Sequence, residues 1–336
     1  MGELPGEKIR DTTTITHLLG LAKEIPALLQ QARAPNTNKL YGQAYNRWKI
    51  WTNNYAEITP LPAQPSHVIL YLIHLEKSAK TYSVINTALC AISWAHNLAG
   101  LESPTRNILV TEISNGLKRR LARPPQPKEP FEREHIQQLI RGMECNNLTD
   151  IRNTLIIVIA YFAFLRVDEL RHVRSTHLNI SHDHVKIAIP KSKCDQLRQG
   201  NSVLVARLGG EICPVALLEN YLKQAKVDIQ SNDHKGVYIF RRLKITNKSV
   251  SLNEKDIPMA YSSVRDLVKR KATQLGLNAN SFGTHSMRIG GATTAANSLI
   301  PDRLFQKHGR WASASSKDRY VKDSQQQRMQ ISQALG

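Results

Sequence analysis

Cysteine is rare in this sequence, and none of it stands at a spacing typical of a metal site. The four cysteines are Cys90, Cys145, Cys194 and Cys213, and no two of them form a CxxC pair. Structural zinc sites and small disulfide-stapled domains depend on such pairs or on a regular set. The pattern therefore excludes both classes and indicates reduced thiols in an intracellular protein.

Long hydrophobic runs are also absent. The N-terminal stretch MGELPGEKIRDTTT has no apolar core of the kind that signal peptides carry, and Gly6 stands where a myristoylation signal requires Ser or Thr. The longest apolar run, residues 155 to 165, is shorter than the ~20 residues that cross a bilayer. We therefore expect no membrane partner, and we predict that this run is a buried helix.

Acidic residues are scarce relative to basic ones. Lysine and arginine number 46 against 27 acids, so the formal net charge is +19 and the pI is about 9.9. A polyanion is the natural partner of such a chain, and nucleic acid is the foremost candidate, although ribosomal, histone-like and membrane-surface proteins share this balance. No P-loop, GxGxxG motif or internal repeat is present. The 336 residues, 41% of them hydrophobic, are enough for two domains.

Proline is concentrated in one short stretch of the chain. Residues 123–130, RPPQPKEP, contain four prolines in eight positions, which neither a helix nor a central strand tolerates. We predict a domain linker there. The predicted organisation is a flexible segment over 1–16, a helical domain over 17–122, the linker over 123–130, a second domain over 131–325 and a tail over 326–336.

The first half shows helical periodicity. The stretch TNKLYGQAYNRWKIWTNNY repeats aromatic residues every three or four positions, with Thr37 or Asn38 as its expected N-cap. The aromatic positions are Tyr41, Tyr45, Trp48, Trp51 and Tyr55. A core-packing face is the simpler interpretation, and stacking on bases is the alternative. The candidates for a phosphate-facing surface are Arg47, Lys49, Lys118, Arg119 and Arg120, each of which could instead be an ordinary solvated side chain.

In the second half the periodicity changes. Val185, Ile187 and Ile189 alternate with polar residues, and after a polar turn Val203 and Val205 alternate again. This pattern predicts an antiparallel β-hairpin inside a helical domain. A helix is expected from about Tyr261 to Leu275, with Gly276 as its C-terminal cap.

The stretch GTHSMRIGGAT holds a candidate reactive pair. His285 and Arg288, three positions apart on a helix, would share one face and could bind one phosphate together. The pair alone is a weak signal. Upstream, Arg166 follows the buried apolar run, where a guanidinium is costly unless it is paired, and Glu169 is the expected partner.

These residues belong to an ordered set that resembles the tyrosine recombinase or phage integrase family. The family's motif order is Arg, Lys, His-x-x-Arg, His or Trp, then Tyr. This sequence has Arg166, Lys193, His285 with Arg288, Trp311 and Tyr320 in that order. The residue pattern of HSMRIGGATTAA and HGRWASASSKDRYV is most similar to that of recombinases from the DIRS-like and Crypton branch of eukaryotic mobile elements.

The resemblance implies a fold and a chemistry. The fold is a mainly α, two-domain clamp around duplex DNA, with a SAM-like helical core-binding bundle and a helical DNA breaking-rejoining catalytic domain that carries a small antiparallel hairpin. Arg166 and Arg288 would bind the phosphate oxygens, and Tyr320 would attack phosphorus. His285 would assist the phenol, Lys193 would protonate the leaving 5′-oxygen, and Trp311 would donate its indole N–H. Glu169 and His308 would support the site. No cofactor or metal is implied.

Several alternatives stay open at this stage. Lys191 shares the strand parity of Lys193 and could be the acid instead. The histidines His172, His177, His182 and His184 cluster before the hairpin, but no acid or cysteine stands at ligand spacing, so we expect no metal there. Phe164 and Leu165 depart from the small Thr-Gly turn that family members commonly have before the first arginine.

The expected function is site-specific cleavage and rejoining of DNA strands for integration or excision of a mobile element. Several protomers, four in a full assembly, would act on one DNA. The basic stretch KRRLARPPQPK fits a nuclear localisation signal and, equally, a linker that faces DNA. Two alternatives are a catalytically silent DNA-binding descendant of a recombinase and a type IB topoisomerase-like relaxing enzyme. A generic RNA-binding protein is a third, without a recognition motif in its favour.

Overall fold

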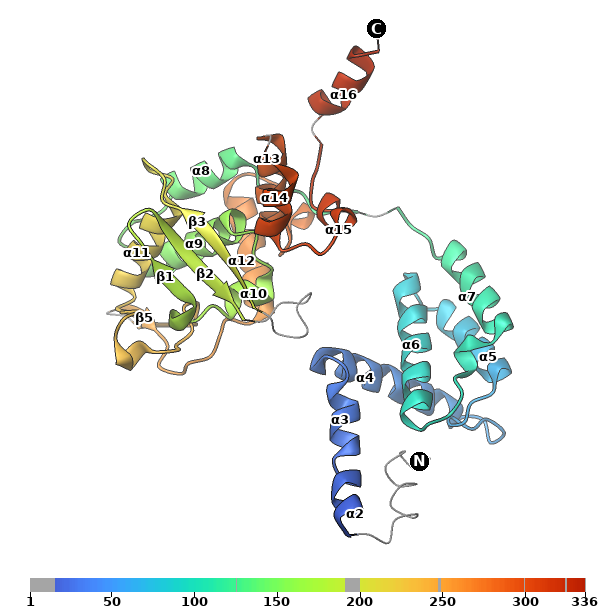
Figure 1. Ribbon diagram of the computed structural model, residues 1–336. Helices are drawn as coiled ribbons and strands as arrows, with labels where there is room; N and C mark the ends of the chain where they lie inside the picture. Colours follow the sequence, from blue (N-terminus) through green and yellow to red (C-terminus); the bar gives the residue numbers. More distant parts are fainter. Residues whose placement is uncertain are drawn as a thin grey trace. The chain divides into compact units, whose positions relative to one another are not determined.

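The computed structural model describes residues 16–124, 126–190, 200–246, 249–298, 300–323 and 325–335. The chain divides into two compact units, Met1–Pro125 and Gln126–Gly336, here called the first and second unit. Both are built mainly of helices, and the second also holds small antiparallel sheets (Figure 1). The predicted fold class, mainly α with a small antiparallel hairpin, is confirmed.

The first unit is a helical bundle. Its helices are α2 (Thr16–Ala22), α3 (Ile25–Gln31), α4 (Pro35–Thr52), α5 (Pro65–Glu76), α6 (Tyr82–Leu98), η1 (Pro104–Arg106) and α7 (Ile108–Arg120). Helix α4 packs on α6, and α5 packs on α7. Trp48, Val68, Leu72, Ile85 and Ile92 are fully buried between these helices. The bundle thus has its own hydrophobic core.

The aromatic stripe of α4 serves this core. Trp48 and Trp51 are buried and lie 5.0 and 5.1 Å, centroid to centroid, from the ring of Tyr71 on α5. Core packing is confirmed for both tryptophans. The expected cap was wrong: α4 begins at Pro35, whose fixed φ suits a first helical position, and Ala34 is the N-cap residue. Tyr55 lies beyond the end of the helix and is half exposed.

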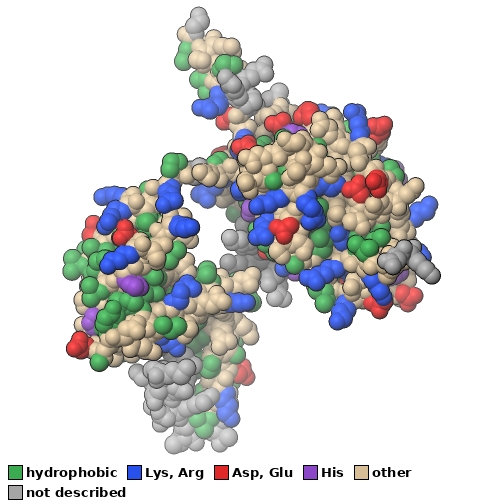
Figure 2. All heavy atoms as spheres, turned by 180° about the vertical axis from the view of Figure 1, so that it is seen from behind, with side chains coloured by type: hydrophobic (Ala, Val, Ile, Leu, Met, Phe, Trp, Pro, Cys, Tyr) green, Lys and Arg blue, Asp and Glu red, His purple; other side chains and the backbone are tan. Residues whose placement is uncertain are grey.

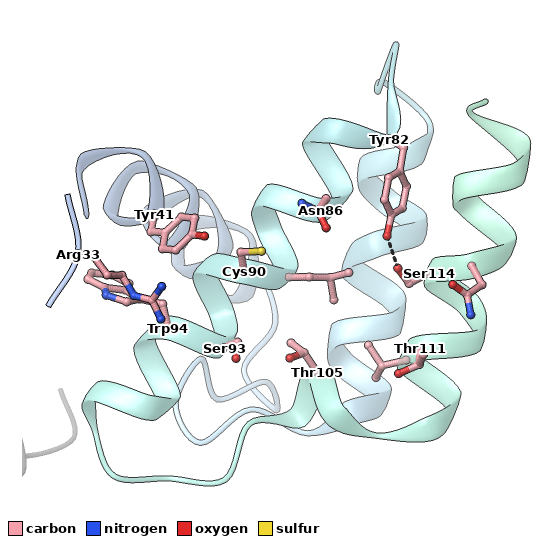
Figure 3. A pocket seen from close by; sticks show the side chains of 13 residues that line it. Arg33, Tyr41, Tyr82, Asn86, Cys90, Ser93, Trp94, Thr105, Thr111 and Ser114 are labelled. Atoms are coloured by element: carbon pink, nitrogen blue, oxygen red, sulfur yellow. Dashed lines mark hydrogen bonds between the residues drawn. The ribbon is translucent and has the colours of Figure 1, made fainter. Parts of the chain in front are cut away.

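A polar hollow lies between α6 and α7 (Figure 3). Asn86 and Ser93 of α6 face Thr111 of α7 across it, and the Tyr82 hydroxyl is 2.6 Å from the Ser114 hydroxyl. At one end the Arg33 guanidinium lies 5.8 Å from the centre of the Tyr41 ring. The hydrogen bond joins the two helices where small polar side chains leave space between them.

The second unit holds the longer list of elements. Its helices are α8 (Arg133–Arg141), α9 (Leu148–Phe162), α10 (Val167–Arg171), η2 (Ser175–His177), α11 (Pro214–Gln224), η3 (Asn232–His234), α12 (Tyr261–Gln274), η4 (Ala279–Ser281), α13 (Ser286–Asn297), α14 (Asp302–Gly309), α15 (Ala314–Asp318) and α16 (Gln325–Gln333). Its strands are β1 (Leu178–Ile180), β2 (His184–Ile189), β3 (Asn201–Ala206), β4 (Leu243–Ile245) and β5 (Val250–Leu252).

Helix α9 is the centre of this unit. Its residues from Ile151 to Tyr161 are buried, and α8, α10, α11 and α13 pack against it (Figure 1). The apolar run therefore forms the buried helix that the sequence predicts. Even its polar Arg152 is buried, where Nη1 donates to the Arg241 carbonyl at 2.9 Å. Helix α12 ends as predicted, with Gly276 in a left-handed conformation just beyond it.

The predicted hairpin is present as β2 and β3, and β1 pairs with the other edge of β2. Val185 pairs with Val205 and Ile187 with Val203, and all four side chains are buried on the face that joins the core. Residues 191–199, which include Lys191, Lys193 and Cys194, lie outside the described residues. The other three cysteines are free. No helix in the described ranges is both long and apolar enough to span a membrane.

His96 fastens the loop between α4 and α5 to α6. Its ring is fully buried, Nε2 accepts from the Ala63 backbone N–H at 2.9 Å, and Nδ1 donates to the Ile92 carbonyl at 2.8 Å. Only the neutral ring can make both bonds, because a protonated imidazole has no acceptor. Burial lowers the pKa of His96, and the hydrogen bond to Ile92 opposes this shift in part.

The first unit should therefore lose stability in mild acid. Histidine in an unfolded chain has a pKa of about 6.5, so the unfolded state takes up the proton first as the pH falls. We expect the free energy of unfolding to be lower at pH 5.5 than at pH 7.5, measured by urea unfolding with tryptophan fluorescence. H96Q should lack most of this pH dependence, whereas H74Q, at an exposed position of α5, should keep it. An unchanged dependence in H96Q would contradict the assignment.

Candidate active site

Arg166 stands at the turn between α9 and α10. Helix α9 ends at Phe162, the backbone passes through Phe164 in a left-handed conformation (φ 47°), and Arg166 is the N-cap residue of α10. Glu169 holds it there: Oε1 is 2.7 Å from Arg166 Nη1, and Oε2 accepts from the Arg166 backbone N–H at 2.9 Å. The expected pairing of these two residues is present, and the Glu169 side chain is buried.

Arg288 comes from α13 and is fully buried. Its Nη1 donates to the Phe164 carbonyl and its Nη2 to the Gly309 carbonyl. Its Cζ lies 4.7 Å from the centre of the Trp311 ring and 4.9 Å from the centre of the Tyr320 ring. The guanidinium is thus enclosed by two carbonyls and two aromatic faces, which favour a cation.

His285 stands directly before α13. It is the N-cap residue and is exposed, whereas Arg288, three positions further on, is buried within the helix. The His285 ring is 6.1 Å from the Tyr320 ring. Both side chains therefore lie beside the ring of Tyr320, and their joint binding of a phosphate stays a prediction.

Trp311 and Tyr320 complete the group. Their rings are 5.6 Å apart, and Trp311 is buried in a small cluster with Phe164, Ala292 and Phe305. Within the described residues the indole Nε1 of Trp311 has no hydrogen-bond partner, and the same holds for Arg288 Nε. An anionic ligand would satisfy these two buried donors, which lie on the side chains that contact the Tyr320 ring.

The chain around Tyr320 is fastened to α13. The Thr293 hydroxyl donates to the Tyr320 carbonyl at 3.4 Å and accepts from the Lys322 backbone N–H at 3.1 Å. Tyr320 and Val321 pack against the Trp311 cluster. The tyrosine is therefore held beside Arg288 of its own chain.

Sequence reasoning missed Arg310. This residue is buried, and its Nη2 lies 3.0 Å from Glu169 Oε2, so that one carboxylate is shared by Arg166 and Arg310. Its place next to Trp311 was the only sequence signal. Neighbouring His308 Nε2 donates to the Phe162 carbonyl at 2.8 Å, and its ring lies 4.6 Å from that of Phe164. His308 thus packs in the wall of the site, and its supporting role in the reaction stays a prediction.

Positive charge exceeds negative charge in this interior. Three guanidinium groups and one carboxylate give a net charge of 3 − 1 = +2. Burial, reinforced by Arg166 and Arg310, lowers the pKa of Arg288 to about 9, so that it still carries its proton at neutral pH. Burial alone would raise the pKa of Glu169, but Arg310 and Arg166 hold it below its usual value. Burial, with the charges of Arg310 and Arg288, also lowers the pKa of His308.

The structure brings together most of the predicted site residues. Those that meet are Arg166, Glu169, His285, Arg288, His308, Trp311 and Tyr320. Lys193 and its alternative Lys191 lie outside the described residues. Of the described His, Cys, Asp and Glu side chains, no three lie together so as to hold a metal ion, and this includes the four histidines near the hairpin.

The five basic candidates of the first unit fall into two groups. Arg47 and Lys49 are on α4, and Lys118, Arg119 and Arg120 form the last turn of α7, where Arg120 lies 3.4 Å from Glu76. Figure 2 shows Lys and Arg side chains spread over both units on the face drawn. Their role in binding stays a prediction.

The sequence profile of the Phage integrase family matches residues 130–327, which contain every residue of the site. This chain belongs to the phage integrase family. It is 26% identical over 299 residues to an integrase/recombinase xerD homolog of Selenomonas ruminantium, covering 87% of this chain and 83% of the relative. It is 22% identical over 310 residues to recombinase cre of Escherichia phage P1, covering 88% and 86%.

The fold of this integrase-family chain also has solved counterparts. The XerH site-specific recombinase, in a post-cleavage complex with a palindromic difH substrate, superposes with a TM-score of 0.59 at 16% identity. The match covers 97% of this chain and 86% of that one. At this identity the likeness shows that the two chains share a fold.

The close approach of α13 to α9 should be essential to the site. A Cβ on Gly291 would lie 2.1 Å from the Tyr161 carbonyl oxygen and 2.6 Å from the Phe164 ring, which no relaxation of a single side chain can relieve. G291A should therefore lower the free energy of unfolding by at least about 1–3 kcal/mol. The check is thermal or urea unfolding followed by circular dichroism.

The matched control is G116A in α7, where a Cβ meets nothing within 4 Å. Alanine is the better helix former, so G116A should be neutral or stabilising by up to about 1 kcal/mol. Equal stability of G291A and the unaltered protein would show that α13 does not pack as described.

Proposed function

We propose that this phage integrase family protein cleaves and rejoins DNA strands at specific sites, with Tyr320 as the nucleophile. One observation supports this above all: Tyr320 lies against a buried guanidinium and an unpartnered indole N–H, in an interior that carries two net positive charges. Such a site suits a phosphodiester, whose non-bridging oxygens gain negative charge as a fifth ligand approaches phosphorus.

The proposed reaction conserves the phosphodiester bond energy. The Tyr320 oxygen attacks phosphorus and gives up its proton, with His285 as the nearest assisting group, while the bond to the 5′-oxygen breaks. Lys193, or Lys191 in its place, supplies a proton to that leaving oxygen. The product is a 3′-phosphotyrosyl ester, which a 5′-hydroxyl of another strand reverses by attacking the same phosphorus. The proposed reaction therefore needs neither ATP nor a metal ion.

The arginines would act through their fixed, permanently charged forks. Arg166 is 14% exposed and stands at the edge of the site, whereas Arg288 is fully enclosed. The free Nε of Arg288 and Nε1 of Trp311 are the donors that a non-bridging oxygen would meet next to Tyr320. Losing one donor of this kind typically reduces the rate by about a hundred- to a thousandfold.

The wider context is part of the same proposal. Duplex DNA is the partner, and several protomers, a tetramer in the full assembly, act together because each cuts one strand. The tail after Tyr320, with exposed Met329, Ile331 and Leu335, is available to pack on a neighbouring protomer. Integration or excision of a mobile element of the DIRS-like or Crypton kind, in the nucleus, fits the sequence texture of the motifs.

One observation favours a second candidate, a DNA-binding protein that descends from a recombinase but no longer cuts. Both Nη atoms of Arg288 are already bonded to carbonyls, and none of its surface is exposed, so in this conformation a phosphate reaches none of its nitrogens. The left-handed Phe164 that supplies one of these carbonyls stands at the turn where the family commonly has Thr-Gly.

A covalent-trapping experiment separates the two. Purified protein is mixed, without metal or ATP, with nicked suicide duplexes that it demonstrably binds, and the products are resolved under denaturing conditions. We expect a protein–DNA adduct with the unaltered protein and none with Y320F, which keeps the ring but has no nucleophile. Absence of an adduct on every bound duplex would leave the DNA-binding descendant. Relaxation of supercoils by a monomer would instead indicate topoisomerase-like activity.

DNA affinity should depend strongly on salt. Each phosphate that the protein neutralises adds about 0.9 to the slope of log K against log salt concentration. If Lys118 and Arg119 each contact a phosphate, the double variant K118M/R119M should reduce that slope by roughly 2, measured by fluorescence anisotropy. The double variant K223M/K235M, which removes exposed lysines outside the candidate set, should leave it unchanged. An unaltered slope in K118M/R119M would remove the end of α7 from the DNA interface.

A further inference from the structure

Arg310 occupies a position that a charged residue rarely takes. Its side chain is 2% exposed, and its backbone is left-handed, with φ 56° and ψ 42°, directly after α14. A left-handed conformation disfavours residues other than glycine, and a buried guanidinium must be paired to be tolerated. Contacts within the fold must therefore offset the backbone strain and the cost of burying the charge.

The terminal nitrogens of Arg310 have four acceptors, all in its own chain, while its buried Nε has no partner within the described residues. Nη1 donates to the carbonyls of Ala163 at 3.2 Å and His308 at 2.8 Å. Nη2 donates to the Phe164 carbonyl at 2.9 Å and to Glu169 Oε2 at 3.0 Å. Both terminal nitrogens are therefore occupied, and the side chain has almost no surface from which to reach DNA.

Two of these partners are the groups that hold the phosphate-binding arginines. Glu169 Oε1 accepts from Arg166 Nη1, and Oε2 accepts both from the Arg166 backbone N–H and from Arg310 Nη2. The Phe164 carbonyl accepts from Arg288 as well as from Arg310. Arg310 is thus in direct contact with the support of Arg166 and with the support of Arg288.

We propose that Arg310 is a positioning residue that fixes Arg166 and Arg288 relative to each other, through the Glu169 carboxylate on one side and the Phe164 carbonyl on the other. The proposal rests on the proposed function for the identity of the ligand, a phosphate. The arrangement of the two arginines is a property of the folded chain and can be tested without cleavage.

Removing Arg310 should affect the reaction more than DNA binding. Without it, Glu169 is free to turn both oxygens toward Arg166, the Phe164 carbonyl keeps only Arg288, and the net charge falls from +2 to +1. A displacement of about 1 Å in such a site lowers rates by roughly a hundredfold. R310M should therefore form the covalent adduct on the order of a hundredfold more slowly, at nearly unchanged duplex affinity. R310K should fall between, because lysine keeps the charge but not the fork.

The experiment measures single-turnover adduct formation and duplex affinity for R310K, R310M, E169Q and R310M/E169Q. If the two residues act through one contact, the double variant should lose less than the product of the two single losses. R141M, which removes an exposed arginine paired with Glu211 in the same unit, is the matched control and should react at the unaltered rate. Circular dichroism confirms folding of each variant, and R310K decides if R310M does not fold.

A second readout does not need cleavage. Inorganic phosphate and orthovanadate, which adopts the five-coordinate geometry of the transition state, should raise the melting temperature of the unaltered protein and of R141M. The rise should be smaller in R310K and absent in R310M. If this pattern is found but no adduct forms, the proposed function fails and the positioning role stands.

Three results would overturn the inference. The first is an R310K protein that matches the unaltered protein in both rate and anion protection. The second is an R310M protein whose only defect is weaker DNA binding, with a salt slope reduced by about 0.9, since that marks a direct phosphate contact. The third is an unaltered protein that neither anion protects and that forms no adduct, which would end the proposed function as well.

Discussion

The buried C-terminal end of α9 is the constraint on which the site depends. The last carbonyls of a helix have no partner within it, and away from water each must find a donor. Here the Phe162 carbonyl accepts from His308, the Ala163 carbonyl from Arg310, and the Phe164 carbonyl from both Arg288 and Arg310. The negative end of the helix dipole favours the same positive groups. Three carbonyls without a partner in the helix thereby bind the side chains of His308, Arg288 and Arg310.

This arrangement explains how three guanidinium groups coexist in one interior. Their mutual repulsion is offset by the Glu169 carboxylate, which touches two of them, and by carbonyl dipoles that contact the third. The compensation is incomplete, and two net positive charges stay beside Tyr320. Because the arginines outnumber the carboxylate, the site would attract an incoming phosphate. The packing around the end of α9 thus sets the charge that the proposed chemistry needs.

Phe164 contributes both to the packing of the site and to the binding of its arginines. Its left-handed backbone directs its carbonyl toward Arg288 and Arg310, and its ring packs against Gly291, His308, Phe305 and Trp311. The aromatic contacts offset the strain of a left-handed phenylalanine. The departure from a Thr-Gly turn therefore has a structural consequence. The Phe164 ring fills the space next to Trp311 that a glycine would leave empty.

The sequence alone determined the helical character, the hairpin, the buried run of α9 and the ordered set of Arg166, His285, Arg288, Trp311 and Tyr320. These features depend on local periodicity and on the kind and order of reactive residues, which are visible in one dimension. The pairing of Arg166 with Glu169 was also predictable, because the two are one helical turn apart.

Tertiary structure decided which arginine is enclosed, where His285 lies, and that Arg310 joins the site. In the sequence, nothing distinguishes Arg310 from a surface arginine. It is buried because the residues after α14 pack against the end of α9, and its partner Ala163 lies 147 residues earlier in the chain. The start of α4 at Pro35 likewise follows from backbone geometry rather than from the best capping side chain nearby. Contacts between distant segments set the surroundings of each side chain, and those surroundings determine its charge state and its partners.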